Sequence, residues 1–458
     1  MDILIILILA ISMVLTFWAI IKKYNPTVTL LAAGLILITI AYFFNIGDGK
    51  IPLKKPTDFF FVDIFAVLTE NFKATFSGVG MYILTIGGFA YFIEKIGSGQ
   101  TLVYYAIKPL KKIKNPYIVL ALIFYFGVFL NIFIDSAAGL GLLLVATVYP
   151  ILRELGISKL AAASVISTTG SFAITPLSTI GALNAELLHL PLHEYFFNYK
   201  IYTSVFIVLF AGLSHLVWHK YCDNKKSIVI SDEDNVETSD LKPGNPLLAI
   251  IPLIPIFIMF IPLFNKQIKM DISTVMFASV AISVVLMAIV KKLSLKEVFT
   301  LVGEYLSGMS KILSVVILVI AGQIFAAGLI DMGAVTYLIK LGNSLQLGGL
   351  GISLIFATIA FLLAAMIGSA NAVVIAFANL SPAIAAQFSV PLMMFLMPLH
   401  DLAILGRPLA PVAGVVIAVA GITQVNVIDL VRRNCVPMIS TAVFAFAINL
   451  ILLPILLK

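Results

Sequence analysis

Apolar stretches of about 20 residues recur along nearly the whole chain, and no other feature limits its fold so strongly. Each is long enough to cross the roughly 30 Å hydrocarbon core of a bilayer as a helix. Only 11% of the residues are charged, against about 25% in soluble domains. The sequence therefore predicts an all-α polytopic membrane protein. The expected spans lie near 3–21, 27–45, 78–97, 116–134, 158–175, 197–218, 247–264, 272–290, 312–330, 349–367 and 436–457.

The N-terminal stretch and the net charge each permit a second interpretation. Residues 1–21 could be a signal peptide, but they begin without a basic region and lead directly into further spans, so we expect a retained helix. The net charge of +7 could indicate a nucleic-acid partner. The basic residues, however, lie in short loops between spans, where membrane topology requires them. We expect membrane lipids as partners and no nucleic acid.

Four shorter apolar pieces interrupt the series of spans. They are rich in Gly, Ser, Thr, Asn and Pro, and they are too short or too polar to be ordinary spans. We expect re-entrant hairpins and broken helices at these places. The four pieces are 135–152, 176–190, 369–389 and 408–425.

The two halves of the chain resemble each other across a polar linker at 220–246. Residues 135–139 correspond to 368–372, and residues 175–177 correspond to 410–412, at offsets of 233 and 235 residues. Two amphipathic segments, which fit helices lying in the membrane interface, keep a similar separation. A duplicated unit is the simplest explanation. The expected repeats are 1–219 and 247–458, and the amphipathic segments are 58–73 and 294–311.

Lysine clusters in the loops predict the orientation of these repeats. Clusters follow the spans at 3–21, 78–97 and 272–290. If they lie in the cytoplasm, the N-terminus is periplasmic and the 220–246 linker is cytoplasmic. The span at 78–97 and its counterpart at 312–330 then cross the membrane in opposite directions. We therefore expect two inverted-topology repeats, although four lysines between residues 50 and 73 oppose this orientation.

Helix breaks at membrane depth predict where a ligand binds, because hydrocarbon cannot satisfy the backbone groups that they free. Helix N-termini suit a carboxylate, and carbonyls and hydroxyls suit a coupling Na⁺ or H⁺. The candidate substrate-binding residues are Ser136, Thr168, Thr169, Thr175, Pro176, Ser178, Thr179, Ser369, Asn371, Arg407 and Pro411. The candidate ion-coupling residues are Asn131, Asp135, Ser171, Gly368, Asn379 and Asp401. The alternative for the hydroxyls is that they bond carbonyls of their own helices.

Two charged candidates each have two interpretations. Arg407 lies in a long region with little other charge, where an arginine is costly unless paired. Its planar guanidinium suits a substrate carboxylate, and the alternative is an ion pair with Asp401. Asp135 could bind a proton or cation, and it could equally cap the helix that follows.

Several motifs resemble those of the DcuC-type anaerobic carriers of four-carbon dicarboxylates, and the resemblance runs almost end to end. They are residues 87–90, 115–117, 136–147 and 405–421. The resemblance implies uptake, exchange or efflux of fumarate, succinate, malate or aspartate in a bacterial inner membrane, without a cofactor. It also implies membership of the ion transporter superfamily. The expected architecture is then a homodimer that works as an elevator, with a scaffold domain and a moving transport domain.

The chain departs from the family pattern at two places in its first half. The acid that usually follows the break at 175–181 is absent, and Asp135 stands where a small or hydroxyl residue is usual. A different organic anion, such as citrate or a monocarboxylate, therefore stays open.

Other functional classes lack their sequence signatures. An intramembrane enzyme would need a metal-ligand or catalytic pair such as His-Glu-x-x-His, and His193-Glu194 has no second ligand at that spacing. Ring-like channel filters are missing as well. A cation/proton antiporter without an organic substrate is the closest rival, because it also uses broken helices and buried acids.

Overall fold

The computed structural model describes residues 2–46, 51–53, 55–57, 59–107, 115–132, 134, 136–225, 244–259, 261, 271–334, 336–337, 340 and 348–457. Within these residues the secondary structure is helical. The first half contains α1 (Asp2–Ile21), α2 (Pro26–Phe43), α3 (Phe60–Ser77), α4 (Val79–Lys95), α5 (Ser98–Ile107), α6 (Pro116–Asn131), α7 (Ala137–Thr147), α8 (Tyr149–Glu154), α9 (Lys159–Thr168), α10 (Thr179–Leu187), α11 (Leu192–Tyr195), the π-helical turn η2 (Phe196–Lys200) and α12 (Ile201–Lys225).

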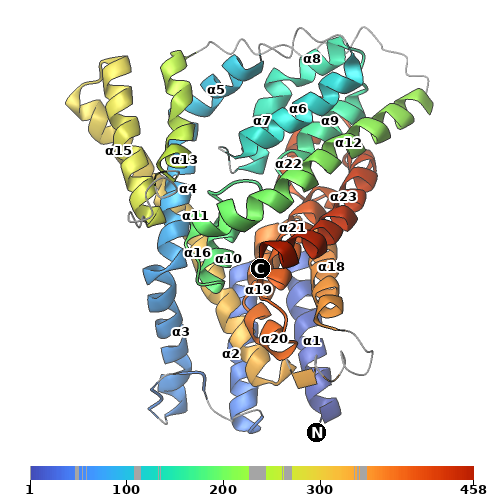
Figure 1. Ribbon diagram of the computed structural model, residues 1–458. Coiled ribbons are helices and arrows are strands. Elements are labelled where there is room, and N and C mark those ends of the chain that lie inside the picture. The colour runs from blue at the N-terminus through green and yellow to red at the C-terminus, as the bar shows by residue number, and fades with distance from the viewer. Residues whose placement is uncertain are drawn as a thin grey trace.

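The second half contains the 3-10 helix η3 (Pro246–Leu253), α13 (Ile254–Met259), α15 (Ile272–Lys291), α16 (Leu295–Asp331), α18 (Gly349–Ile367), α19 (Ala370–Ala378), α20 (Ser381–Gln387), α21 (Met393–Gly406), the 3-10 turn η4 (Arg407–Leu409), α22 (Gly414–Thr423) and α23 (Val427–Leu456). In Figure 1, α6, α7, α8, α9 and α22 gather in the upper right, and the N-terminus lies at the bottom.

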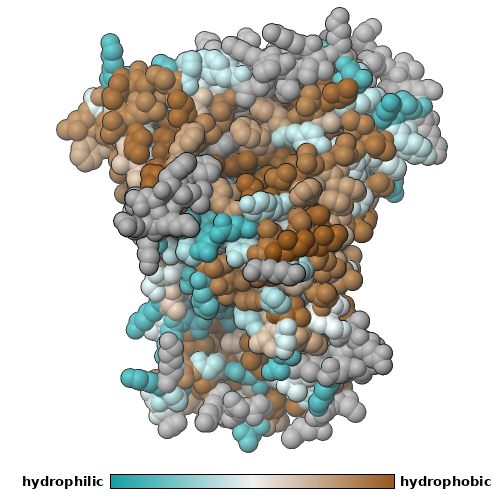
Figure 2. All heavy atoms as spheres, viewed as in Figure 1, coloured by the Kyte–Doolittle hydropathy of each residue, from teal (hydrophilic) through white to brown (hydrophobic). Residues whose placement is uncertain are grey.

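The predicted polytopic membrane class is confirmed. Eight helices of the described chain are long and apolar enough to cross a membrane, or up to ten if each bent pair counts as one span. Many large apolar side chains on α1, α12, α15 and α23 are exposed, and Figure 2 shows broad apolar areas on the visible face. Lipid is the medium that suits such a surface.

The amphipathic segment at 294–311 is not a separate interfacial helix, and that prediction was wrong. It is the first part of α16, which runs without interruption over 37 residues. Ser294 and Glu297 form a reciprocal capping box that starts the helix, and α16 packs against α2 and α4. Its expected counterpart at 58–73 forms α3, which meets α4 at a bend of 53°.

Two other boundaries differ from expectation. The linker begins later than residue 220, because α12 continues through Lys225 and buries the side chain of Asp223. The apolar stretch at 158–175 forms only a ten-residue helix, α9, which ends at Thr168.

The four interrupted pieces form short helices, as predicted. The pieces at 135–152 and 369–389 become the pairs α7–α8 and α19–α20. The pieces at 176–190 and 408–425 contain α10 and α22. The helices follow one another in a similar order in both halves, and α10 and α22 begin at Thr179 and Gly414. The two sets also pack across the halves, since α7 contacts α22 and α10 contacts α19.

Candidate functional site

Two irregular segments interrupt the helices in equivalent places. The first break, residues 169–178, separates α9 from α10, and the second break, residues 407–413, separates α21 from α22. Ser178 caps α10 by accepting a hydrogen bond from the Gly181 amide across 3.2 Å. A side-chain cap of this kind satisfies one of the free amides at a helix start.

The starts of α7 and α19 lie against these breaks. A Cβ on Gly170 would lie 2.8 Å from the Cβ of Ala137, the first residue of α7. A Cβ on Gly368 would lie 3.0 Å from the Cα of Ala413, and Gly368 has a φ of +78°, which favours glycine. The N-terminus of α7 therefore meets the first break, and those of α19 and α22 meet at the second. Such ends carry partial positive charge.

Arg407 joins the two breaks. Its Nη2 group donates to the carbonyl of Gly170 and lies 3.4 Å from the hydroxyl of Ser171. Arg407 comes from the second half of the chain and its partners come from the first. Because Gly170 touches Ala137, this guanidinium lies near the N-terminus of α7, and both features favour an anion.

Asp401 makes its ion pair with Lys200, so the predicted alternative of a pair with Arg407 was wrong. Lys200 Nζ contacts Oδ1 of Asp401, and Asn449 Nδ2 donates to Oδ2 across 2.9 Å. The two charged side chains are only 2% and 4% exposed. Arg407 lies beyond the end of α21, in η4, and its guanidinium contacts the first break instead.

A small cavity lies between the first break, α12 and α21, with space for about one water molecule. Ser171 and Asp401 both line it, so it adjoins the Arg407 contact and the Lys200–Asp401 pair. Ser204 of α12 also lines it and donates to the Ala173 carbonyl across 3.0 Å. The remaining lining residues are Phe172, Ala173, Ile207, Val208, Ile404 and Leu405.

Most of the predicted hydroxyl candidates bond backbone groups, and Thr168 and Thr169 bond carbonyls of their own helix, which is the alternative that the sequence left open. Thr168 donates to the carbonyl of Ser164 across 2.9 Å, and Thr169 donates to Ile166 at the same distance. Thr175 reaches across to the Ile132 carbonyl at 2.8 Å. Ser136 and Ser369 cap α7 and α19. These hydroxyls shape the breaks and the helix starts that surround Arg407.

The other candidates are distributed around the same region. Asn131 donates to the Phe172 carbonyl across 3.1 Å and ties the end of α6 to the first break. Asn379 donates to Ile375 of its own helix. Pro176 and Thr179 are buried, Asn371 is partly exposed and Pro411 is exposed. Asp135 lies outside the described residues.

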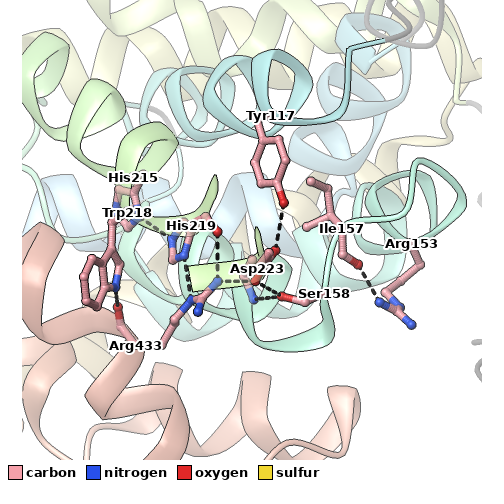
Figure 3. A network of polar contacts seen from close by, with 10 residues as sticks. Tyr117, Arg153, Ile157, Ser158, His215, Trp218, His219, Asp223 and Arg433 are labelled. Atoms are coloured by element: carbon pink, nitrogen blue, oxygen red, sulfur yellow. Dashed lines mark hydrogen bonds and ion pairs between the residues drawn. The ribbon is translucent and has the colours of Figure 1, made fainter. Parts of the chain in front are cut away.

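Sequence reasoning missed a buried polar chain that ends at Thr168, directly before the first break. Figure 3 shows its part from Arg433 and Asp223 to His215. Arg433 pairs with Asp223, and its Nε group lies 2.9 Å from Nδ1 of His219. The two histidines contact each other through His219 Nε2 and His215 Nδ1, at 2.9 Å. His215 Nε2 then lies 3.1 Å from the hydroxyl of Thr168. The spacing of the histidines, four residues apart on one helix, was the available signal.

Asn434, which follows Arg433 in α23, contacts the second break. Its Nδ2 group donates to the Pro408 carbonyl across 3.0 Å, and its Oδ1 accepts from Ser164 across 2.6 Å. Arg433 and Asn434 therefore connect α23 to both breaks.

With this geometry established, comparison with known proteins identifies the family. The family model described as the C4-dicarboxylate anaerobic carrier, DcuC, matches residues 1–454. The chain belongs to the DcuC family. DcuC proteins are transporters, so this chain is a membrane transporter and not an enzyme.

Curated DcuC relatives match along almost their full length. The "Probable anaerobic C4-dicarboxylate transporter DcuC" of Vibrio cholerae is 29% identical over 456 residues, which cover 97% of this chain and 98% of the relative. The anaerobic C4-dicarboxylate transporter DcuC of Escherichia coli K12 is 27% identical over 438 residues, covering 95% of this chain and 94% of the relative. The predicted resemblance is confirmed.

Two solved transporters share the DcuC chain's fold. MtrF of Neisseria gonorrhoeae, described as one of a class of antimetabolite efflux pumps, superposes with a TM-score of 0.64 at 15% identity, covering 92% of this chain and 94% of MtrF. The YdaH transporter of Alcanivorax borkumensis superposes with a TM-score of 0.64 at 12% identity, covering 93% of this chain and 98% of YdaH.

Proposed function

We propose that this protein carries C4-dicarboxylates such as fumarate, succinate, malate and aspartate across the bacterial inner membrane, with Arg407 holding one substrate carboxylate. The observation that carries the proposal is the position of Arg407. This residue starts the second break, and its guanidinium contacts Gly170 and Ser171 of the first break. The names of the DcuC relatives support the choice of substrate class.

The local physics favours a carboxylate at this place. A guanidinium offers its donors in a planar fork that matches a carboxylate. One donor of Arg407 bonds the Gly170 carbonyl, which is a neutral acceptor. A carboxylate is a stronger acceptor, because hydrogen bonds between charged partners are roughly twice as strong as neutral ones. The N-terminus of α7 adds a favourable field. The substrate-binding role of the other predicted hydroxyl and proline residues belongs to this proposal.

The proposed mechanism is an elevator built from two inverted repeats, 1–219 and 247–458. The similar succession of helices in both halves supports the duplication. The reciprocal packing of α7 on α22 and of α10 on α19 supports the inversion, because an inverted pair places each break beside the other half's hairpin. A periplasmic N-terminus, a cytoplasmic linker between α12 and η3, and a homodimer complete this part of the proposal.

Transport is coupled to Na⁺ or H⁺ in this proposal. Asn131 and Ser171 border the first break, and Gly368 borders the second. Asp401 supplies a carboxylate beside the same cavity as Ser171. Asn379 and Asp135 complete the proposed ion-coupling set.

Two alternatives keep specific support. The absence of the usual acid after the first break favours a different organic anion, such as citrate or a monocarboxylate. The buried Lys200–Asp401 pair favours a cation/proton antiporter without an organic substrate, because buried acids and lysines in membranes mark ion paths.

Uptake into proteoliposomes tests these possibilities. The purified protein is reconstituted, and uptake of labelled succinate, fumarate, citrate and lactate is measured under separate Na⁺ and pH gradients. We expect uptake of succinate and fumarate that competes with malate and aspartate. Uptake of citrate or lactate alone would contradict the proposed substrate class. Gradient-driven cation exchange that no organic anion changes would identify an antiporter.

A further inference from the structure

We propose that Lys200 is a second carboxylate anchor, and that Asp401 leaves Lys200 and takes up a proton when a dicarboxylate binds. This inference rests on the proposed function and deepens it. In this inference the site has two roles. It distinguishes dicarboxylates from monocarboxylates, and it couples the binding of a dicarboxylate to the uptake of a proton.

The first argument is the position of the pair. Lys200 ends the π-helical turn η2, a type of irregularity that often marks functional sites. Its ammonium contacts Asp401, which lines the cavity together with Ser171. Ser171 in turn contacts Arg407. Two lining residues of the cavity therefore each contact a cation, Ser171 contacting Arg407 and Asp401 contacting Lys200.

The second argument is the size of the cavity. It has space for about one water molecule while Lys200 and Asp401 are paired. A dicarboxylate is larger than this space, so part of the cavity lining must move to admit it. Asp401 lines the cavity, and in the proposal it moves away from Lys200, so that the freed ammonium meets the second carboxylate.

The third argument is charge. Lys200 and Asp401 are almost fully buried, so a carboxylate that loses its cation there is strongly disfavoured. Uptake of a proton removes that charge. The Asp401 carboxylate becomes a carboxylic acid, the ammonium of Lys200 keeps its charge, and the substrate carboxylate replaces Asp401 as its partner. One proton is bound for each dicarboxylate.

The surroundings of Asp401 offer few competing charges. The helices α18, α19 and α20, which pack on or beside α21, contain no titratable side chain. The charged residues Asp429, Arg432 and Arg433 of α23 lie near its start, far from Asn449. The nearby titratable groups are Lys200, Tyr195 and His400.

His400 is an independent sign of a functional site. It is 1% exposed, and neither ring nitrogen has a hydrogen-bond partner among the residues that the structure describes. A buried polar group without a partner is costly and rare in native proteins. His400 precedes Asp401 directly in α21 and lies within the electrostatic influence of Lys200.

Proton uptake on substrate binding is the direct test. Succinate is added to the purified protein in weakly buffered detergent solution, at a pH at which free succinate is a dianion, and a pH dye records proton uptake. We expect about one proton per bound succinate. Binding without proton uptake would overturn the inference. A protein that binds a different anion in place of succinate would instead contradict the proposed function.

Two single variants separate the roles. Asp401→Asn should bind succinate without proton uptake and with an affinity that no longer depends on pH. Lys200→Gln should weaken succinate binding at least about tenfold, while the affinity for butyrate, which has one carboxylate, changes little. The inference fails if Asp401→Asn still takes up the proton, or if Lys200→Gln keeps the succinate affinity of the unmodified protein.

A double variant guards against misfolding, and an exposed acid serves as the control. Lys200→Gln combined with Asp401→Asn removes both buried charges and keeps polar side chains that can still contact each other. It should fold, bind succinate weakly and take up no proton, and wild-type succinate affinity in this variant would overturn the inference.

Asp429→Asn removes an acid whose side chain is 53% exposed, and it should change neither proton uptake nor affinity.

Discussion

The Nε group of Arg433 lies 2.9 Å from Nδ1 of His219, and this contact orients two histidines. An arginine can only donate, so Nδ1 accepts and the proton of neutral His219 sits on Nε2. Nε2 then donates to Nδ1 of His215, whose own Nε2 proton points at the Thr168 hydroxyl. One cation on α23 thereby orders a chain of hydrogen bonds that ends directly before the first break.

Removal of Arg433 alone should destabilise the protein, because it leaves Asp223 buried without its cation. We expect Arg433→Leu to lower the free energy of unfolding by about 3–5 kcal/mol. Thermal unfolding in detergent measures this loss. The double change Arg433→Leu with Asp223→Leu should recover much of it, and equal melting of the single and double variants would contradict this account.

Thr168→Val should cost about 1–3 kcal/mol, because it leaves the Nε2 proton of His215 without an acceptor. Thr168→Ser keeps the hydroxyl and should restore stability. The matched control is Thr147→Val, since Thr147 bonds only a carbonyl of its own helix among the described contacts. If Thr168→Val and Thr147→Val melt alike, the histidine chain does not depend on Thr168.

Arg407→Lys should transport labelled succinate at least about tenfold more slowly than the unmodified protein, because an ammonium cannot reproduce the planar fork of a guanidinium. Arg407→Ala should transport still more slowly. Initial rates in proteoliposomes at several concentrations separate the apparent affinity from the maximal rate. Arg432→Ala, which removes an exposed cation on α23, is the control. Normal rate and affinity in Arg407→Ala would make Arg407 a structural residue only.

Gly170→Ala should reduce transport, because the added methyl group would lie 2.8 Å from the Cβ of Ala137. The start of α7 must then move away from the first break and from Arg407. Gly303→Ala in α16 adds the same methyl group where nothing lies within 4 Å, and it should transport normally. Uptake rates normalised to reconstituted protein provide the measurement, and equal rates for both variants would count against a close α7–break contact.

Local sequence signals determined the membrane class and the positions of the breaks. The apolar stretches predicted helices because only a helix or a closed barrel satisfies its backbone in lipid. The starts of α7, α10 and α19 follow from Ser136, Ser178 and Ser369, whose hydroxyls cap the helices that begin beside them. Such caps involve neighbouring residues, so a sequence pattern reveals them.

Only the tertiary structure decided which charged residues pair and how long α16 is. Asp401 pairs with Lys200, 201 residues away, and Asp223 pairs with Arg433, 210 residues away. Proximity in sequence suggested Arg407 as a partner for Asp401, but the partner of a buried charge depends on which faces of distant helices are packed together. For the same reason the segment at 294–311 continues into α16, whose later residues pack against α2 and α4. Side-chain periodicity shows that a helix has two faces, whereas only packing shows what covers each of them.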